Sequence, residues 1–142
     1  VESAPQDLIT HGLLDLFGDG HDVTVYKTNT AGPCANGTND NAKIRHIYMP
    51  DMVSQACKSV YEETKKAAHD NDFTLVLGGD HSIAIGSIAG LLSERYPDLA
   101  VIWFDAHADI NTLQTTVSGK LHGCPVSFLL RVEGNEEYPF DW

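Results

Sequence analysis

An unbroken apolar run at residues 99–104 constrains the fold most, because it ends abruptly in the polar segment 105–109. A short apolar run without alternation is typical of a strand buried on both faces, as in parallel sheets covered by helices. Residues 73–77 form a second strand candidate, and residues 82–96 have the pattern of a helix, which Pro97 ends. This order of strand, helix and strand predicts a right-handed crossover between parallel strands. Both strands should therefore end at the same edge of one sheet.

The segments before this unit predict further elements. Apolar residues recur at helical spacing in residues 4–17 and 51–70, which predicts two amphipathic helices. Residues 23–26 are a short strand candidate. Residues 27–50 are rich in Asn, Thr, Gly and Pro and have little periodicity, so we expect a long loop there.

The length of the chain limits its domain organisation. With 142 residues it is long enough for one compact domain and too short for two. We therefore expect residues 1–142 to belong to one α/β domain of three layers, α/β/α, with a mainly parallel sheet between the helices. Residues 133–142 have the character of an open end, so we expect the domain to be partial, incomplete at its carboxyl end.

Charge, hydropathy and cysteine content exclude several classes of partner. A formal net charge of −11 would repel the phosphate backbone, so we expect no nucleic-acid partner. No apolar stretch approaches the ~20 residues that span a bilayer, so we expect no membrane partner. Cys34, Cys57 and Cys124 are odd in number and far apart, which favours a reducing compartment over a disulfide framework.

Potential metal ligands follow the apolar run. Asp105, His107 and Asp109 alternate with alanines, and residues two apart in extended backbone point to one side. His81 follows the neighbouring predicted strand, so parallel pairing would bring it to the same sheet edge. Together they form a mixed nitrogen and oxygen set that suits Mn²⁺, Zn²⁺, Co²⁺ or Fe²⁺. Asp80 could ligate as well, or orient His81.

These ligands indicate hydrolysis. Two neighbouring metal ions can share one water and lower its pKa, which makes hydroxide available at neutral pH. A serine or thiol mechanism is weaker, because the chain has no GxSxG motif and no recognisable Cys and His pair. The alternative for residues 105–109 is a solvated polar turn, which has no need of a histidine flanked by two aspartates.

Several segments resemble the successive signatures of the ureohydrolases, and of arginases in particular. They are GGDHS at 78–82, DAHADINT at 105–112, SGKLHG at 118–123 and PVS at 125–127. The resemblance implies a parallel sheet between helix layers, a homotrimer, and hydrolysis of L-arginine to L-ornithine and urea with two Mn²⁺ ions. It also implies a cytoplasmic or mitochondrial location.

The resemblance also assigns roles to residues. It implies four metal ligands, which are His81, Asp105, His107 and Asp109. His81 and Asp109 would bind one Mn²⁺ ion and His107 the other, with Asp105 bridging both. It implies three residues at the α-carboxylate of arginine, which are Asn111, Ser118 and Gly119. The catalytic residues would be Asp109 and His122, the latter as a proton shuttle.

Departures from the arginase pattern leave rival functions open. Leu113 stands where arginases commonly have Pro, and Lys120 where they commonly have Asn. The resemblance implies that the family's DxD motif, which supplies the remaining metal ligands, lies in a later half that we expect this chain to lack. We therefore expect this chain alone to be inactive. The rivals are another ureohydrolase such as agmatinase, whose substrate lacks a carboxylate, and a non-catalytic truncated isoform.

Four histidines lie outside these segments. They are His11, His21, His46 and His69. No ligand spacing surrounds any of them, so we expect surface roles for all four.

Overall fold

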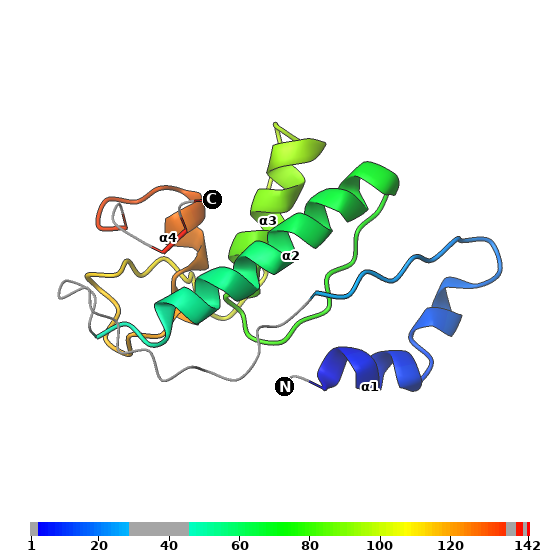
Figure 1. Ribbon diagram of the computed structural model, residues 1–142, viewed down its shortest axis with the longest axis horizontal. Helices are drawn as coiled ribbons and strands as arrows, with labels where there is room; N and C mark the ends of the chain where they lie inside the picture. The colour runs from blue at the N-terminus through cyan, green and yellow to red at the C-terminus, as the bar shows by residue number, and fades with distance from the viewer. Residues whose placement is uncertain (1–2, 29–45, 136–138, 141) are drawn as a thin grey trace.

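A computed structural model describes residues 3–28, 46–135, 139–140 and 142. These residues form four α-helices and two 3₁₀ turns (Figure 1): α1 (Ala4–Thr10), η1 (Leu14–Phe17), α2 (Pro50–Asp70), α3 (Ile83–Glu94), η3 (Leu121–Gly123) and α4 (Pro125–Leu129). The helices expected at 51–70 and 82–96 are confirmed as α2 and α3. The single helix expected at 4–17 is wrong in detail, because it divides into α1 and η1. Most of the expected loop at 27–50 lies outside the described residues.

The three predicted strands are absent from the described residues. Residues 23–26, 73–77 and 99–104 run without strand pairing, and no backbone hydrogen bond joins one of these segments to another. Ile102 and Phe104 are 93% and 101% exposed. A helix satisfies its own backbone, whereas a strand needs a neighbour to do so. The parallel sheet of the expected α/β/α layers is therefore not confirmed by the residues described.

Helices α2 and α3 pack closely against each other. A Cβ atom at Gly86 of α3 would overlap the carbonyl oxygen of Cys57 of α2, so only glycine allows this approach. Cys57 is fully buried at the crossing, and its Sγ donates to the carbonyl oxygen of Ser82 at 3.1 Å. Burial raises the pKa of the Cys57 thiol to about 12, so the thiol stays protonated at neutral pH. Packing against α2 holds the start of α3, which directly follows the GGDHS segment at residues 78–82.

A small apolar core lies under the segment that leads from residue 111 to α4. It consists of Ile47, Leu113, Leu121 and Cys124, with Val53, Phe128 and Phe140 packed against it. Phe128 and Phe140 meet edge to face, with ring centroids 4.7 Å apart. This core fixes the segment that carries the predicted substrate-binding residues.

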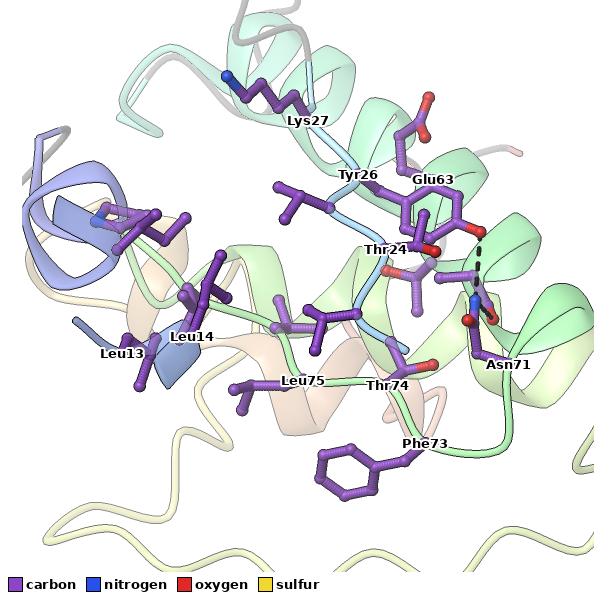
Figure 2. A pocket seen from close by; sticks show the side chains of 18 of the residues that line it. Leu13, Leu14, Thr24, Tyr26, Lys27, Glu63, Asn71, Phe73, Thr74 and Leu75 are labelled. Carbon is purple, nitrogen blue, oxygen red and sulfur yellow. Dashed lines mark hydrogen bonds between the residues drawn. The ribbon is translucent and has the colours of Figure 1, made fainter. Parts of the chain in front are cut away.

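A cavity of about 770 Å³ lies away from this core, between α1, η1, α2 and residues 20–28 and 70–77. Figure 2 shows Leu13, Leu14 and Leu75 on one side and the Tyr26 hydroxyl on the other. Asn71 donates to that hydroxyl at 3.1 Å. None of the predicted site residues lines this cavity, so it does not belong to the site described below.

No helix in the described part of the chain is long and apolar enough to cross a bilayer.

Candidate metal centre and substrate loop

Three of the four predicted metal ligands lie together. His81, Asp105 and Asp109 each offer a ligand atom, and these atoms lie within 4.8 Å of one another. The Nδ1 atom of His81 is 2.8 Å from Asp109 Oδ2 and 3.7 Å from Asp105 Oδ2. One imidazole nitrogen and two carboxylate oxygens are a donor set that divalent transition metals accept. The residues present therefore fit a metal ion.

The local backbone explains this convergence. His81 stands just before α3, at the end of the 73–77 segment, and the two aspartates follow residues 99–104. Asp109 has a left-handed backbone, with φ +46°. Its carbonyl oxygen accepts from Val126 N of α4 at 3.0 Å, and its side chain is only 10% exposed. Asp109 is thus the most firmly held carboxylate of the three-residue group.

His107 is not part of that group. Its backbone N–H donates to Asp105 Oδ1 at 2.8 Å, which bends the chain at residues 105–107. The expected alternation, with all three polar side chains on one side of a strand, is wrong here because this turn replaces extended backbone. The His107 side chain is 81% exposed, with Nδ1 3.5 Å from Asp105 Oδ1. It stands beside the group and contacts it through Asp105.

The electrostatics of Asp105 suit a cation. The backbone hydrogen bond from His107, together with the charges of His81 and His107, holds the pKa of Asp105 below its usual value. A carboxylate that is ionised at neutral pH can bind a metal ion without first releasing a proton.

Asp80 faces His122 rather than His81. Its Oδ1 accepts from both the backbone N–H, at 3.0 Å, and the hydroxyl of Ser82. Its Oδ2 lies 3.4 Å from Nδ1 of His122. Partial burial alone would raise the pKa of Asp80, but the bonds from Ser82 and the neighbouring His122 outweigh it, so this pKa is lowered. The expected role of Asp80 in orienting His81 has no contact to support it.

A second cavity, of about 410 Å³, opens beside the metal ligands. The residues that line it are His107, Ala108, Asp109, Ile110, Asn111, His122 and Gly123. His122 and Asn111 thus share one hollow with the ligand Asp109, as a proton shuttle and a substrate-binding residue would require. Ser118 and Gly119 do not line it.

Hydrogen bonds tie the backbone of Asn111 to α4 and η3. Its N–H donates to Gly123 O at 3.2 Å, and its carbonyl oxygen accepts from Ser127 Oγ at 2.6 Å. Ser127 in turn accepts from Asn135 Nδ2 at 2.8 Å. The Asn111 side chain remains exposed beside the cavity on a fixed backbone.

The rest of the loop is turned by a glycine. Gly119 is buried with φ +68°, in the left-handed region that favours glycine. Ser118 is exposed, and its Oγ accepts from Lys120 N at 3.3 Å. Leu113, the departure from Pro, is 3% exposed, and its N–H donates to Asn135 Oδ1 at 2.9 Å. Proline has no N–H, so a proline at this position could not make that bond.

Two residues near the site were missed by sequence reasoning. The Trp103 ring lies against His81, with centroids 5.0 Å apart and planes inclined by 32°, although the sequence placed it simply in a buried strand. His46 is exposed, in agreement with the expected surface role, but its Nε2 lies 2.7 Å from Leu113 O, a contact that the sequence did not indicate. For Trp103 the available signal was its place two residues before Asp105, while no local pattern marked His46.

A histidine and two carboxylates beside a cavity that Asn111 and His122 line define a candidate metal-binding site of the kind found in hydrolases. The family model described as the arginase family matches residues 6–138. The chain therefore belongs to the arginase family, as the resemblance of its motifs implied.

Individual relatives agree with this family. The arginase of Glaciozyma antarctica is 41% identical over 146 residues, covering 100% of this chain and 42% of that protein. The arginase of Saccharomyces cerevisiae is 53% identical over 89 residues, covering 63% of this chain and 26% of that protein. The chain thus spans less than half the length of these relatives.

A solved structure supports the fold. The crystal structure of a cold-adapted arginase from the psychrophilic yeast Glaciozyma antarctica matches with a TM-score of 0.74 at 39% identity. The match covers 99% of this chain and 45% of the other. The described residues therefore follow part of the arginase fold, although they form no strand.

Proposed function

We propose that this chain supplies part of the active site of a metal-dependent arginase, which hydrolyses the guanidinium of L-arginine to L-ornithine and urea. The observation that carries the proposal is the convergence of His81 with Asp105 and Asp109 beside a cavity that Asn111 and His122 line. Membership of the arginase family supports the same reaction.

The metal ligands follow from the donor groups. His81, Asp105 and Asp109 would hold one ion, and His107 with Asp105 would hold a second, both Mn²⁺ in our proposal. When bound, the ions lower the pKa of a water molecule, so that hydroxide is available to attack the guanidinium carbon.

The chain's own residues orient substrate and move a proton. Asn111, together with Ser118 and Gly119, would bind the α-carboxylate of arginine through hydrogen bonds to a charged group. His122 would protonate the departing ornithine amine as a general acid. Asp80 lies against Nδ1 of His122, which leaves Nε2 for that proton transfer. Asp109 links the two functions, because it is a ligand that also lines the cavity.

A chimera provides the test, since the chain spans 42% of the Glaciozyma antarctica arginase. In it, residues 1–142 replace the aligned segment of that relative. We expect the chimera to release urea from arginine, and Asp105→Ala or Asp109→Ala to abolish the release, because water cannot replace the charge of a ligating carboxylate. His69→Ala on the exposed side of α2 is the control and should leave the rate unchanged. Unimpaired turnover in the Asp105 variant would show that the ligand assignment is wrong.

Assembly and location rest on the family resemblance alone. A homotrimer, and a cytoplasmic or mitochondrial location, stay predictions.

A further inference from the structure

A histidine outside the arginase motifs holds the loop that carries the proposed substrate-binding residues. Nε2 of His46 lies 2.7 Å from the carbonyl oxygen of Leu113, across 67 residues of sequence. A carbonyl oxygen only accepts hydrogen bonds, so Nε2 carries the proton and donates it. This bond fixes the backbone two residues beyond Asn111.

The neighbours of His46 hold the other end of the same loop. Tyr48 N donates to the carbonyl oxygen of Gly119 at 2.7 Å. A Cβ atom at Gly119 would overlap the carbonyl oxygen of His46, so the two backbones are in direct contact. Between these contacts Ile47 is 4% exposed and belongs to the same core cluster as Leu113. We call residues 46–48 the clasp.

The clasp therefore grips the loop at Leu113 and at Gly119. Asn111 lies just before the first contact, and Ser118 lies just before the second. A hydrogen-bonding residue recognises a carboxylate only if its backbone holds it in place, because ordering a free loop opposes binding. None of the clasp residues is among the metal ligands or the lining of the cavity beside them.

We propose that His46 is a positioning residue, which sets the recognition of the arginine α-carboxylate by fixing the loop from Leu113 to Gly119. This inference rests on the proposed function. It predicts that loss of the His46 side chain weakens the binding of a substrate with a carboxylate and leaves metal binding and the chemical step unaltered.

The functional test compares His46→Ala with His46→Gln in the chimera. Gln has an N–H donor at a similar reach, so it should restore the bond to Leu113 O, whereas Ala removes it. We expect His46→Ala to raise the KM for arginine by about threefold to tenfold, the effect of one neutral hydrogen bond, with kcat and bound metal unchanged. His46→Gln should stay close to the unmutated chimera. Hydrolysis of agmatine, which lacks the carboxylate, should be the same in all three proteins.

A general structural role would give a different result. Equal losses on arginine and agmatine, a fall in kcat with loss of metal, or no difference between the Ala and Gln variants would each overturn the proposal. Urea release by the unmutated chimera is measured first. If the unmutated chimera released no urea, the proposed function would be contradicted. The clasp would then be tested by the hydrogen-exchange experiment below.

Hydrogen exchange tests the clasp without a measurement of catalytic activity. In the chimera, amides of residues 113–120 should exchange at least about threefold faster in His46→Ala than in the unmutated or His46→Gln protein, whether or not the chimera is active. Amides in α3, away from the clasp, should exchange at the same rate in all three and serve as an internal control. Unchanged exchange at residues 113–120 in the Ala variant would overturn the proposal.

Discussion

The loop from residue 111 to α4 and the segments at 73–77 and 99–104 carry the two halves of the proposed site and differ sharply in how they are held. The loop rests on a buried core and is tied by hydrogen bonds from His46 and Ser127. The other two segments have exposed apolar side chains and no strand pairing. The difference follows from backbone chemistry, because side chains and helices nearby can satisfy a loop, whereas a strand needs a neighbouring strand.

The proposed site lies across this contrast. We call residues 73–77 and 99–104 the open segments, and the loop from residue 111 to α4 the braced loop. His81 and Asp105 follow the open segments, while Asn111 and Ser118 belong to the braced loop. Asp109 lies between the two regions. The hydrogen bond from Val126 of α4 to its carbonyl oxygen holds this metal ligand in place. We therefore expect metal binding to depend on further strands that pair with the open segments. Substrate selectivity should instead depend on contacts already present in this chain.

The largest expected effect concerns the open segments. A polypeptide of these 142 residues alone should hydrolyse arginine at least roughly a thousandfold more slowly than the chimera, since a catalytic unit that lacks several of its groups loses most of its rate. Its exposed apolar segments should also promote aggregation. The check is urea release at equal concentrations of chimera and fragment. A fragment rate comparable to that of the chimera would show that the open segments need no partner.

The next effect tests the braced loop. Asn111→Ala and Ser118→Ala in the chimera should each lower kcat/KM for arginine by roughly ten- to a hundredfold, since a hydrogen bond to a charged group contributes about 1.5–3 kcal/mol. Agmatine hydrolysis should hardly change, because agmatine has no carboxylate to lose a partner. The measurement is kcat/KM for both substrates in both variants. Equal losses on the two substrates would mean that these residues act on structure or metal, and would favour an agmatinase-like enzyme.

The smallest effect tests the packed helices that support both regions. Gly86→Ala should lower the free energy of unfolding by about 1–3 kcal/mol, because the added methyl overlaps the Cys57 carbonyl. At a solvent-exposed position in a helix, a change from Gly to Ala would instead stabilise the protein by up to about 1 kcal/mol, so the sign of the effect is decisive. Urea unfolding of the chimera gives the value. Ser93→Ala, at an exposed position of α3, is the matched control and should change stability by less than about 0.5 kcal/mol.

Local patterns in the sequence predict the helices well, and three of the four predicted ligands lie near one another. The spacing of apolar residues predicted α2 and α3, since helix formation depends on neighbours in sequence. The position of His81 after one predicted strand and of Asp105 after another predicted that they would meet. The turn that sends His107 outward was not predictable from alternation, because a hydrogen bond between Asp105 and the His107 backbone decides it.

Contacts between distant segments are the part that the sequence does not reveal. His46 and Leu113 lie 67 residues apart, and nothing near His46 marks it as a partner of the loop. The pairing of Asp80 with His122 is hidden in the same way, since the sequence indicates only that Asp80 could ligate a metal ion or orient its neighbour His81. The predicted parallel sheet also depends on distant pairing, and the described residues do not provide it.

The central claim is that His81, Asp105 and Asp109 form one metal centre, and counting bound manganese tests it most directly. The chimera and its Asp109→Ala variant would be loaded with Mn²⁺, dialysed, and analysed for metal per chain. We expect about two ions per chain in the unmutated chimera and at most about one in the variant. The His69→Ala control should match the unmutated chimera. Full occupancy in the Asp109 variant would contradict the claim, because a centre that keeps its metal without its most firmly held carboxylate is not built on these residues.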